Sequence, residues 1–276
     1  MKVLAKRLMR AVLPLEIRKY LVLWIGRQQW VNPARRAWLS VELIQDYGDK
    51  DINAYHKFLW GHHLFYASPY AVDTRFGVDN IRPSRKLFFS HLLQQLAHQG
   101  IGPEQVRSVY EVGCSLGYQL RHMETELFPC LSDLHGIDID EHAIRAGREY
   151  LRAVGSKVEL ICGDMQHLEE SLGDKMYDII LCCGVLMYLK EADAAMVVRS
   201  MLRHSRGLVG IAGLAHPTVD NRFLKGSTVR SRDRTFVHNI ERMIEESGGV
   251  ILSRRWDGDR LVDGQSIYFV FAARGR

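Results

Sequence analysis

The sequence predicts an α/β fold in which a largely parallel sheet carries helices on both faces. From residue 106 onward, short apolar runs alternate with helical stretches, which is the pattern of βαβ units. Right-handed crossovers between parallel strands place the connecting helices on both sides of a sheet. A length of 276 residues suits one such domain with an added segment at one end.

The parallel units are predicted in a regular order along the chain. Their strands are apolar runs rich in Val, Ile and Leu, and the intervening stretches have helical periodicity. Strands are expected at 108–114, 133–139, 157–163, 177–185 and 207–213, and helices at 83–99, 118–128, 141–154 and 193–204.

The C-terminal end is predicted to be antiparallel. Residues 235–247 have apolar side chains on one helical face and end at a pair of glycines. Two strands follow at 250–256 and 266–274, joined by a short segment rich in Asp and Gly. Because so short a link cannot hold a crossover helix, we expect these strands to be antiparallel to each other.

The positive charge of the chain is concentrated at its N-terminal end. The net charge is +5, and residues 1–40 alone hold nine Lys or Arg against Glu16, so the remaining residues sum to −3. Residues 1–80 lack the βαβ rhythm and are predicted to form a basic helical arm or cap, with 81–276 as the main domain. The arm could pack as a cap, lie on an anionic membrane surface or bind nucleic acid, of which nucleic acid is the least favoured.

Nothing in the first residues predicts export or a membrane span. The best apolar run, 20–26, is far short of the ~20 residues of a spanning helix, and Lys6, Arg7 and Arg10 interrupt any signal-like region. The five cysteines form no CxxC pair and no zinc-like spacing, so we expect reduced thiols and no metal. The expected location is the cytoplasm. If the arm binds a membrane, we expect the protein to lie peripherally at the inner face of that membrane.

The most informative motif is VYEVGCSLGYQL at residues 109–120. Glu111 ends an apolar run, and Gly113 and Gly117 lie in a turn that opens a helix, where glycine allows close approach of a ligand. The spacing E-x-G-x-x-x-G differs from the G-x-G-x-x-G of dinucleotide sites. The motif resembles motif I of the class I S-adenosylmethionine-dependent methyltransferases. This resemblance implies that these residues, with Cys114, receive the amino-acid end and ribose of S-adenosylmethionine.

The next strand ends in HGIDID, about 20 residues beyond the glycine turn. The resemblance assigns the ribose hydroxyls to Asp138, with Ile139 beside it, because a carboxylate at this strand end can accept both hydrogen bonds. Asp140 is expected to cap the helix that follows.

The third and fourth strands also end in residues that match the family. The resemblance places Gly163, Asp164 and Met165, in CGDM, beside the adenine, and it places Cys183 and Gly184, in YDIILCCGVLMYL, beside the methionine moiety. It covers about residues 80–276. It implies a Rossmann-like seven-stranded mixed sheet of order 3-2-1-4-5-7-6 with the last strand antiparallel.

The acceptor site is predicted from residues that have no place in the sheet. Alignment of the acceptor with the methyl group is the main catalytic requirement, and a hydroxyl acceptor also benefits from a general base. His216 and Tyr188 are the predicted catalytic residues, and the other candidates for the base are Asp220, His62, His63 and Tyr66.

A long basic loop at 213–235 follows the fifth strand. Its Arg and Lys side chains could hold a phosphate or carboxylate of the acceptor, or face solvent. We expect the acceptor site between this loop and residues 62–70 of the arm. The alternative for His216 is that it only shapes the loop.

The expected activity is methyl transfer from S-adenosylmethionine to an oxygen of a small molecule or glycan, with S-adenosylhomocysteine as product. An RNA or protein methyltransferase is one alternative, although the chain has GVLMYL where amine methyltransferases carry a motif like NPPY. A non-catalytic protein that retains the nucleotide pocket is the other alternative.

Overall fold

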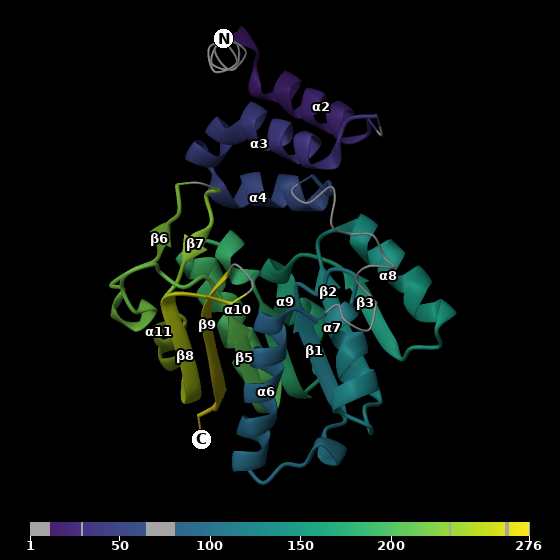
Figure 1. The fold of residues 1–276 in the computed structure, drawn as a ribbon, viewed down its shortest axis with the longest axis vertical. Helices are drawn as coiled ribbons and strands as arrows, with labels where there is room; N and C mark the ends of the chain where they lie inside the picture. Colours follow the sequence, from purple (N-terminus) through teal and green to yellow (C-terminus); the bar gives the residue numbers. More distant parts are fainter. Residues whose placement is uncertain (1–11, 29, 65–80, 232, 263–264, 276) are drawn as a thin grey trace.

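The structure is a computed structural model that describes residues 12–28, 30–64, 81–231, 233–262 and 265–275. A seven-stranded sheet lies at its centre (Figure 1). Its order is β3-β2-β1-β4-β5-β9-β8, and β9 is antiparallel to both of its neighbours. The predicted topology is therefore confirmed. The strands are β1 (Ser108–Val112), β2 (Asp133–Asp138), β3 (Val158–Cys162), β4 (Tyr177–Cys183), β5 (Ser205–Ala212), β8 (Gly249–Val262) and β9 (Gln265–Arg274).

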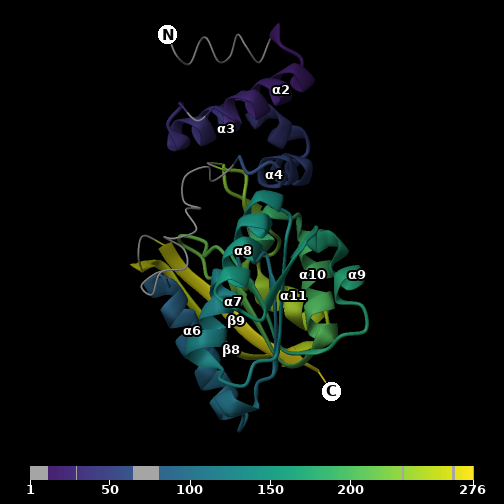
Figure 2. The ribbon, with the colours of Figure 1, turned by 90° about the vertical axis from the view of Figure 1, so that its right-hand side faces the viewer.

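Helices cover both faces of this sheet (Figure 2). One apolar cluster joins α6, α7 and α8 to one face, and a second joins α9, α10 and α11 to the other. The helices are α6 (Pro83–His98), α7 (Tyr118–His122), α8 (Glu141–Ala153), α9 (Leu168–Leu172), α10 (Glu191–His204) and α11 (Ile240–Glu246). Short 3-10 turns occur at Pro103–Gln105, Met165–His167, Leu186–Tyr188 and Asn221–Phe223.

Three helices precede the sheet and stack beyond one end of it: α2 (Leu15–Gly26), α3 (Pro33–Lys50) and α4 (Ile52–Gly61). In Figures 1 and 2, α2 lies farthest from the sheet and α4 nearest to it. These helices share a core of their own, which includes Val22, Ile44 and Leu59. Pro14 stands at the N-cap of α2, where its missing N–H costs nothing. No helix among the described residues is long and apolar enough to cross a bilayer.

Three elements differ from the sequence expectations. The helix expected at 118–128 is α7 followed by a π-helical turn, Met123–Leu127. The helix expected at 235–247 begins only at Ile240, because Asn239 caps it by accepting the Arg242 N–H at 2.9 Å. The residues before that cap form β7 (Phe236–Val237), which pairs with β6 (Thr228–Val229).

The third difference is the length of β8. The Asp- and Gly-rich segment expected as a connection belongs largely to this strand, which runs to Val262. Pairing with β9 shifts register between Trp256 and Leu261, so the strand absorbs extra residues there and resumes.

Candidate active site

A cavity of about 560 Å³ lies at the carboxyl ends of β1 to β5. Residues of α4, α6 and β9 complete its lining. Open α/β sheets bind their ligands at this edge, where the order of strands reverses. The reversal falls here between β1 and β4, because β1 pairs with β2 on one side and with β4 on the other.

The glycines of the first motif have different tasks. Gly113 lines the cavity with a φ of 77°, and a Cβ there would lie 2.2 Å from Cγ2 of Val185. Gly117 is the N-cap of α7 with a φ of 79°, and a Cβ there would meet Leu160 at 2.8 Å. Gly117 is not among the cavity residues. Both positions need glycine, but only Gly113 does so at the cavity itself.

Glu111 lies behind the cavity wall. Its side chain is 1% exposed, and Oε1 accepts a hydrogen bond of 2.5 Å from Nε2 of Gln119, which does line the cavity. Burial raises the pKa of Glu111 to about 8, against the opposing effect of Arg85. A buried carboxyl group of this kind keeps its proton near neutral pH until a cation comes close.

Asp138 ends β2 and lines the cavity, together with Ile139. Its Oδ2 accepts the Ser115 N–H at 2.8 Å, and its Oδ1 accepts the Asp140 N–H at 2.9 Å. Burial raises the pKa of Asp138 to about 6, while these backbone bonds act against the rise. The carboxylate is therefore held in one orientation, and each oxygen keeps a second lone pair for a ligand.

Asp140 has the predicted capping role. Its Oδ1 accepts the Ala143 N–H at 3.1 Å, at the first turn of α8. Its Oδ2 contacts Nδ1 of His63, which follows α4. The cap therefore also ties the arm to the end of β2.

The end of β3 brings Gly163, Asp164 and Met165 to the cavity. Asp164 Oδ1 accepts the Gln166 N–H at 3.0 Å, and its Oδ2 lies 2.6 Å from Nζ of Lys57 in α4. Sequence reasoning missed Lys57, because nothing in the pattern of α4 indicates which acid it meets.

The end of β4 contributes Cys183 and Gly184. Arg85 of α6 also lines the cavity, and its Nη2 donates to the Cys183 carbonyl at 3.1 Å. Burial raises the pKa of the Cys183 thiol to about 11 and that of the Cys114 thiol well above its usual range, so both line the cavity as neutral groups. Arg85 is a second residue that the sequence analysis did not identify.

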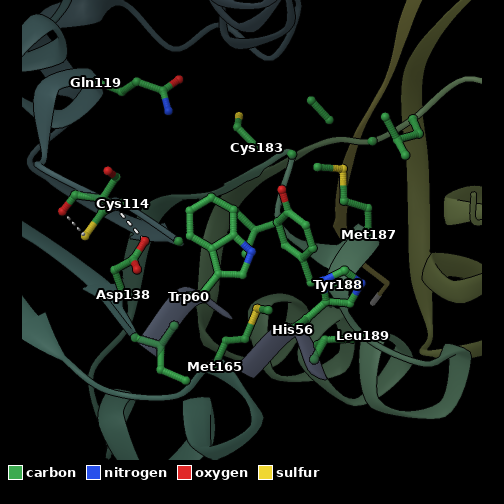
Figure 3. A pocket seen from close by; sticks show the side chains of 18 of the residues that line it. His56, Trp60, Cys114, Gln119, Asp138, Met165, Cys183, Met187, Tyr188 and Leu189 are labelled. Atoms are coloured by element: carbon green, nitrogen blue, oxygen red, sulfur yellow. Dashed lines mark hydrogen bonds between the residues drawn. The ribbon is translucent and has the colours of Figure 1, made fainter. Parts of the chain in front are cut away.

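A group of aromatic rings forms another part of the cavity wall (Figure 3). The ring centroid of Tyr188 lies 5.2 Å from that of Trp60 and 5.0 Å from that of His56. His56 is 1% exposed, and its Nε2 donates to the Arg234 carbonyl at 3.0 Å. Burial lowers the pKa of His56, so the ring is neutral, and because Nε2 carries the proton, Nδ1 carries the lone pair.

His216 is not among the cavity residues. Its Nδ1 accepts the Val219 N–H at 3.1 Å, and its own N–H donates to Asn221 Oδ1 at 2.8 Å. The ring therefore holds the turn of the loop that contains it. Asp220, another candidate for the base, forms an ion pair with Arg254.

The remaining predicted acceptor residues are only partly brought together. His62 and His63 do not line the cavity, and Tyr66 lies outside the described residues. Of the basic loop at 213–235, Arg230 reaches the cavity, where its Nε donates to Asp233 at 3.0 Å. Arg234 of the same loop pairs with Asp49 of α3.

The cavity fits a ligand that donates hydrogen bonds. Three buried oxygens near the end of β1 have no hydrogen-bond partner within the described part of the chain: Glu111 Oε2, Gln119 Oε1 and Ser115 Oγ. An ammonium group and hydroxyls would satisfy such atoms. Among the described residues, no group of three or more His, Cys, Asp or Glu is placed to hold a metal ion.

The sheet order and a cavity at the strand ends define a Rossmann-like domain. Residues 109–207 match a family model described as a methyltransferase domain. Over these residues the chain is similar to the S-adenosylmethionine-dependent methyltransferases, and the match supports an enzyme that uses S-adenosylmethionine. A search of curated protein sequences found no match to the chain.

Solved structures of low sequence identity share this fold. Magnesium protoporphyrin IX methyltransferase from Synechocystis PCC 6803, solved with bound S-adenosylmethionine, aligns with a TM-score of 0.54 at 13% identity, over 82% of this chain and 98% of its own. An S-adenosylmethionine-dependent methyltransferase from Leishmania major aligns with a TM-score of 0.57 at 13% identity, over 82% and 84%. A third, from Clostridium acetobutylicum ATCC 824, aligns with a TM-score of 0.51 at 13% identity, over 81% of this chain and 100% of its own.

Proposed function

We propose that this enzyme transfers a methyl group to an oxygen of a small molecule or glycan and releases S-adenosylhomocysteine. The observation that carries this proposal is the composition of one cavity. Hydrogen-bond acceptors held in one orientation, such as Asp138 and Gln119, line it near the ends of β1 and β2. The rings of His56, Trp60 and Tyr188 line it from α4 and from the turn after β4. The first set suits the cofactor, and the second suits an organic acceptor beside it.

The cofactor would be held by the strand ends. Asp138 is suited to the ribose hydroxyls, Asp164 and Met165 to the adenine, and Gln119 with Glu111 to the ammonium group. Arg85 carries a guanidinium that suits the carboxylate. When bound, S-adenosylmethionine supplies a methyl group already activated by the sulfonium.

We assign the general base to His56 rather than to His216. His56 lines the cavity and burial lowers its pKa; because Nε2 donates to the Arg234 carbonyl, Nδ1 is the nitrogen that would take the proton of an acceptor hydroxyl. Tyr188 would position the acceptor against the ring of Trp60, in keeping with its predicted place at the catalytic centre. Arg230, at the cavity wall, is suited to a carboxylate or phosphate on the acceptor.

We also propose a cytoplasmic location, with residues 1–80 acting as an arm on the methyltransferase domain of residues 81–276. The five cysteines are free thiols, in keeping with a reducing compartment. The basic composition of the arm supports peripheral contact with the inner face of a membrane.

The proposal is tested first by binding and then by turnover. Calorimetry should show S-adenosylmethionine and S-adenosylhomocysteine binding in the micromolar range, at about −7 to −8 kcal/mol. Transfer of an isotopically labelled methyl group to hydroxylated small molecules and sugars should follow, and His56→Gln should slow it about 10²–10⁴-fold while cofactor affinity is retained. Methylation of RNA or protein substrates alone would contradict the acceptor class. Cofactor binding with no transfer to any class would favour a non-catalytic protein.

A further inference from the structure

We infer that the outer face of α2 is a docking surface for an anionic lipid membrane. Five large apolar side chains of this region are exposed: Val12 by 68%, Ile17 by 48%, Tyr20 by 70%, Trp24 by 50% and Trp30 by 78%. Ile17, Tyr20 and Trp24 are spaced i, i+3 and i+7, so they lie on one face of the helix. We call these three residues the α2 outer face.

This face is distinct from the one that holds the helix in the protein. Val22 is fully buried, and Arg18 is 4% exposed, with its guanidinium bonded to Asp46 at 2.8 Å and to the Leu43 carbonyl at 2.8 Å. Turning α2 to bury the outer face against α3 would break these bonds and expose Val22. The orientation is therefore fixed, and the apolar outer face is left for a partner outside the described chain.

The residue types favour a membrane interface. Tyr and Trp concentrate where the headgroups of a bilayer meet its hydrocarbon, because their rings are apolar and their N–H or O–H is polar. A helix of 12 residues is too short to span a bilayer but long enough to lie in its surface.

Charge selects the lipid over a second copy of the chain. Residues 1–28 contain seven Lys or Arg and one Glu, a net charge of +6. Arg18 is paired with Asp46, whereas Arg27 at the C-cap of α2 and Arg35 in the first turn of α3 are exposed. Two copies paired through this face would bring equal positive charges together, whereas phosphatidylserine headgroups would neutralise them. Helix α2 also lies at the end of the molecule farthest from the sheet (Figure 1), so the sheet domain does not obstruct a membrane at that end.

This inference rests on the membrane contact proposed above and not on methyl transfer, so vesicle binding and methylation are measured separately. The full-length protein is sedimented with vesicles of phosphatidylcholine, either pure or containing phosphatidylserine. We expect binding only to the anionic vesicles, and weaker binding as salt screens the charges.

The double substitution Tyr20→Ser with Trp24→Ser should reduce the vesicle partition coefficient by about tenfold or more, because two large apolar groups no longer leave water. Phe223→Ser is the matched control, since Phe223 is 65% exposed in the 3-10 turn Asn221–Phe223, outside the arm, and its replacement should leave vesicle binding unchanged. Arg27→Glu with Arg35→Glu should weaken binding to anionic vesicles through charge alone.

All variants should keep the melting temperature and cofactor affinity of the wild type, because the replaced side chains are exposed. Equal vesicle binding by the Tyr20/Trp24 variant and the Phe223 control would overturn the inference. So would a wild-type dimer that ignores vesicles and becomes monomeric in the Tyr20/Trp24 variant, because the α2 outer face would then be an interface between two copies.

Discussion

Replacing Gly113 by alanine should destabilise the protein far more than the same change at Gly155. Both glycines have positive φ, 77° and 64° respectively, so alanine is strained at either position. That strain costs about 1–2 kcal/mol. A Cβ at Gly155 meets nothing within 4 Å, so strain is the whole cost there.

At Gly113 a steric cost is added to the strain. The new Cβ would lie 2.2 Å from Cγ2, 2.7 Å from Cγ1 and 2.9 Å from Cβ of Val185. Val185 must move, and forcing extra atoms into packed structure typically costs about 1–3 kcal/mol. The expected loss in unfolding free energy is thus about 2–5 kcal/mol at Gly113 and about 1–2 kcal/mol at Gly155. Because Val185 also lines the cavity, cofactor binding should weaken only in the first variant.

Urea unfolding of the two variants measures the stability difference, and calorimetry measures the binding difference. Adding Val185→Ala to Gly113→Ala removes the two shortest contacts and leaves the one at 2.9 Å. The double variant should therefore recover part of the lost stability, and a double-mutant cycle should show favourable coupling. Equal destabilisation at Gly113 and Gly155, or additive effects of Gly113 and Val185, would refute the steric argument.

Three further predictions concern ionisable groups. Asp138→Ala should weaken cofactor binding by about 1–3 kcal/mol in calorimetry, because the ribose hydroxyls lose a charged acceptor; unchanged affinity would remove Asp138 from the site. Glu111 has a pKa of about 8 in the folded protein against an ordinary 4.5, so it lowers stability progressively as pH rises from 4.5 to 8. Glu111→Gln should then raise the unfolding free energy at pH 8 by more than at pH 5, and the opposite order in urea titrations would falsify this. His56→Gln should lower kcat about 10²–10⁴-fold. In the wild type the rate should fall only below pH 6.5, because burial lowers the His56 pKa, and this fall should be absent from the variant. His216→Ala should change neither kcat nor the pH profile.

The sheet and the cavity at its strand ends were predictable because they depend on local patterns. Apolar runs of five to eight residues separated by helices specify parallel strands, and the carboxyl ends of those strands must share one edge. Gly113, Asp138, Asp164 and Cys183 each end a strand or follow its end, so their presence at one cavity follows from topology alone. The β8 strand was underestimated because Asp and Gly favour turns locally, while pairing with β9 outweighs that preference.

The other residues of the cavity were not predictable in the same way. The apolar face of α4 indicates that the helix packs on something, but not that it packs at the strand ends. His56 and Trp60 therefore looked like ordinary helix residues. His216 looked catalytic because it follows β5 closely, yet it forms hydrogen bonds within its own loop instead of facing the cavity.

Helix α4 makes the arm an integral part of the site. Lys57 contacts Asp164 at the end of β3, and Trp60 packs on Tyr188 after β4. Asn53, at the other end of the helix, accepts the Lys190 N–H at 3.0 Å. These contacts hold α4 over the ends of β3 and β4, so its position sets both the space beside Asp164 and the place of His56, the proposed base. A change that loosens α4 should therefore affect cofactor and acceptor together, whereas changes on the α2 outer face should affect neither.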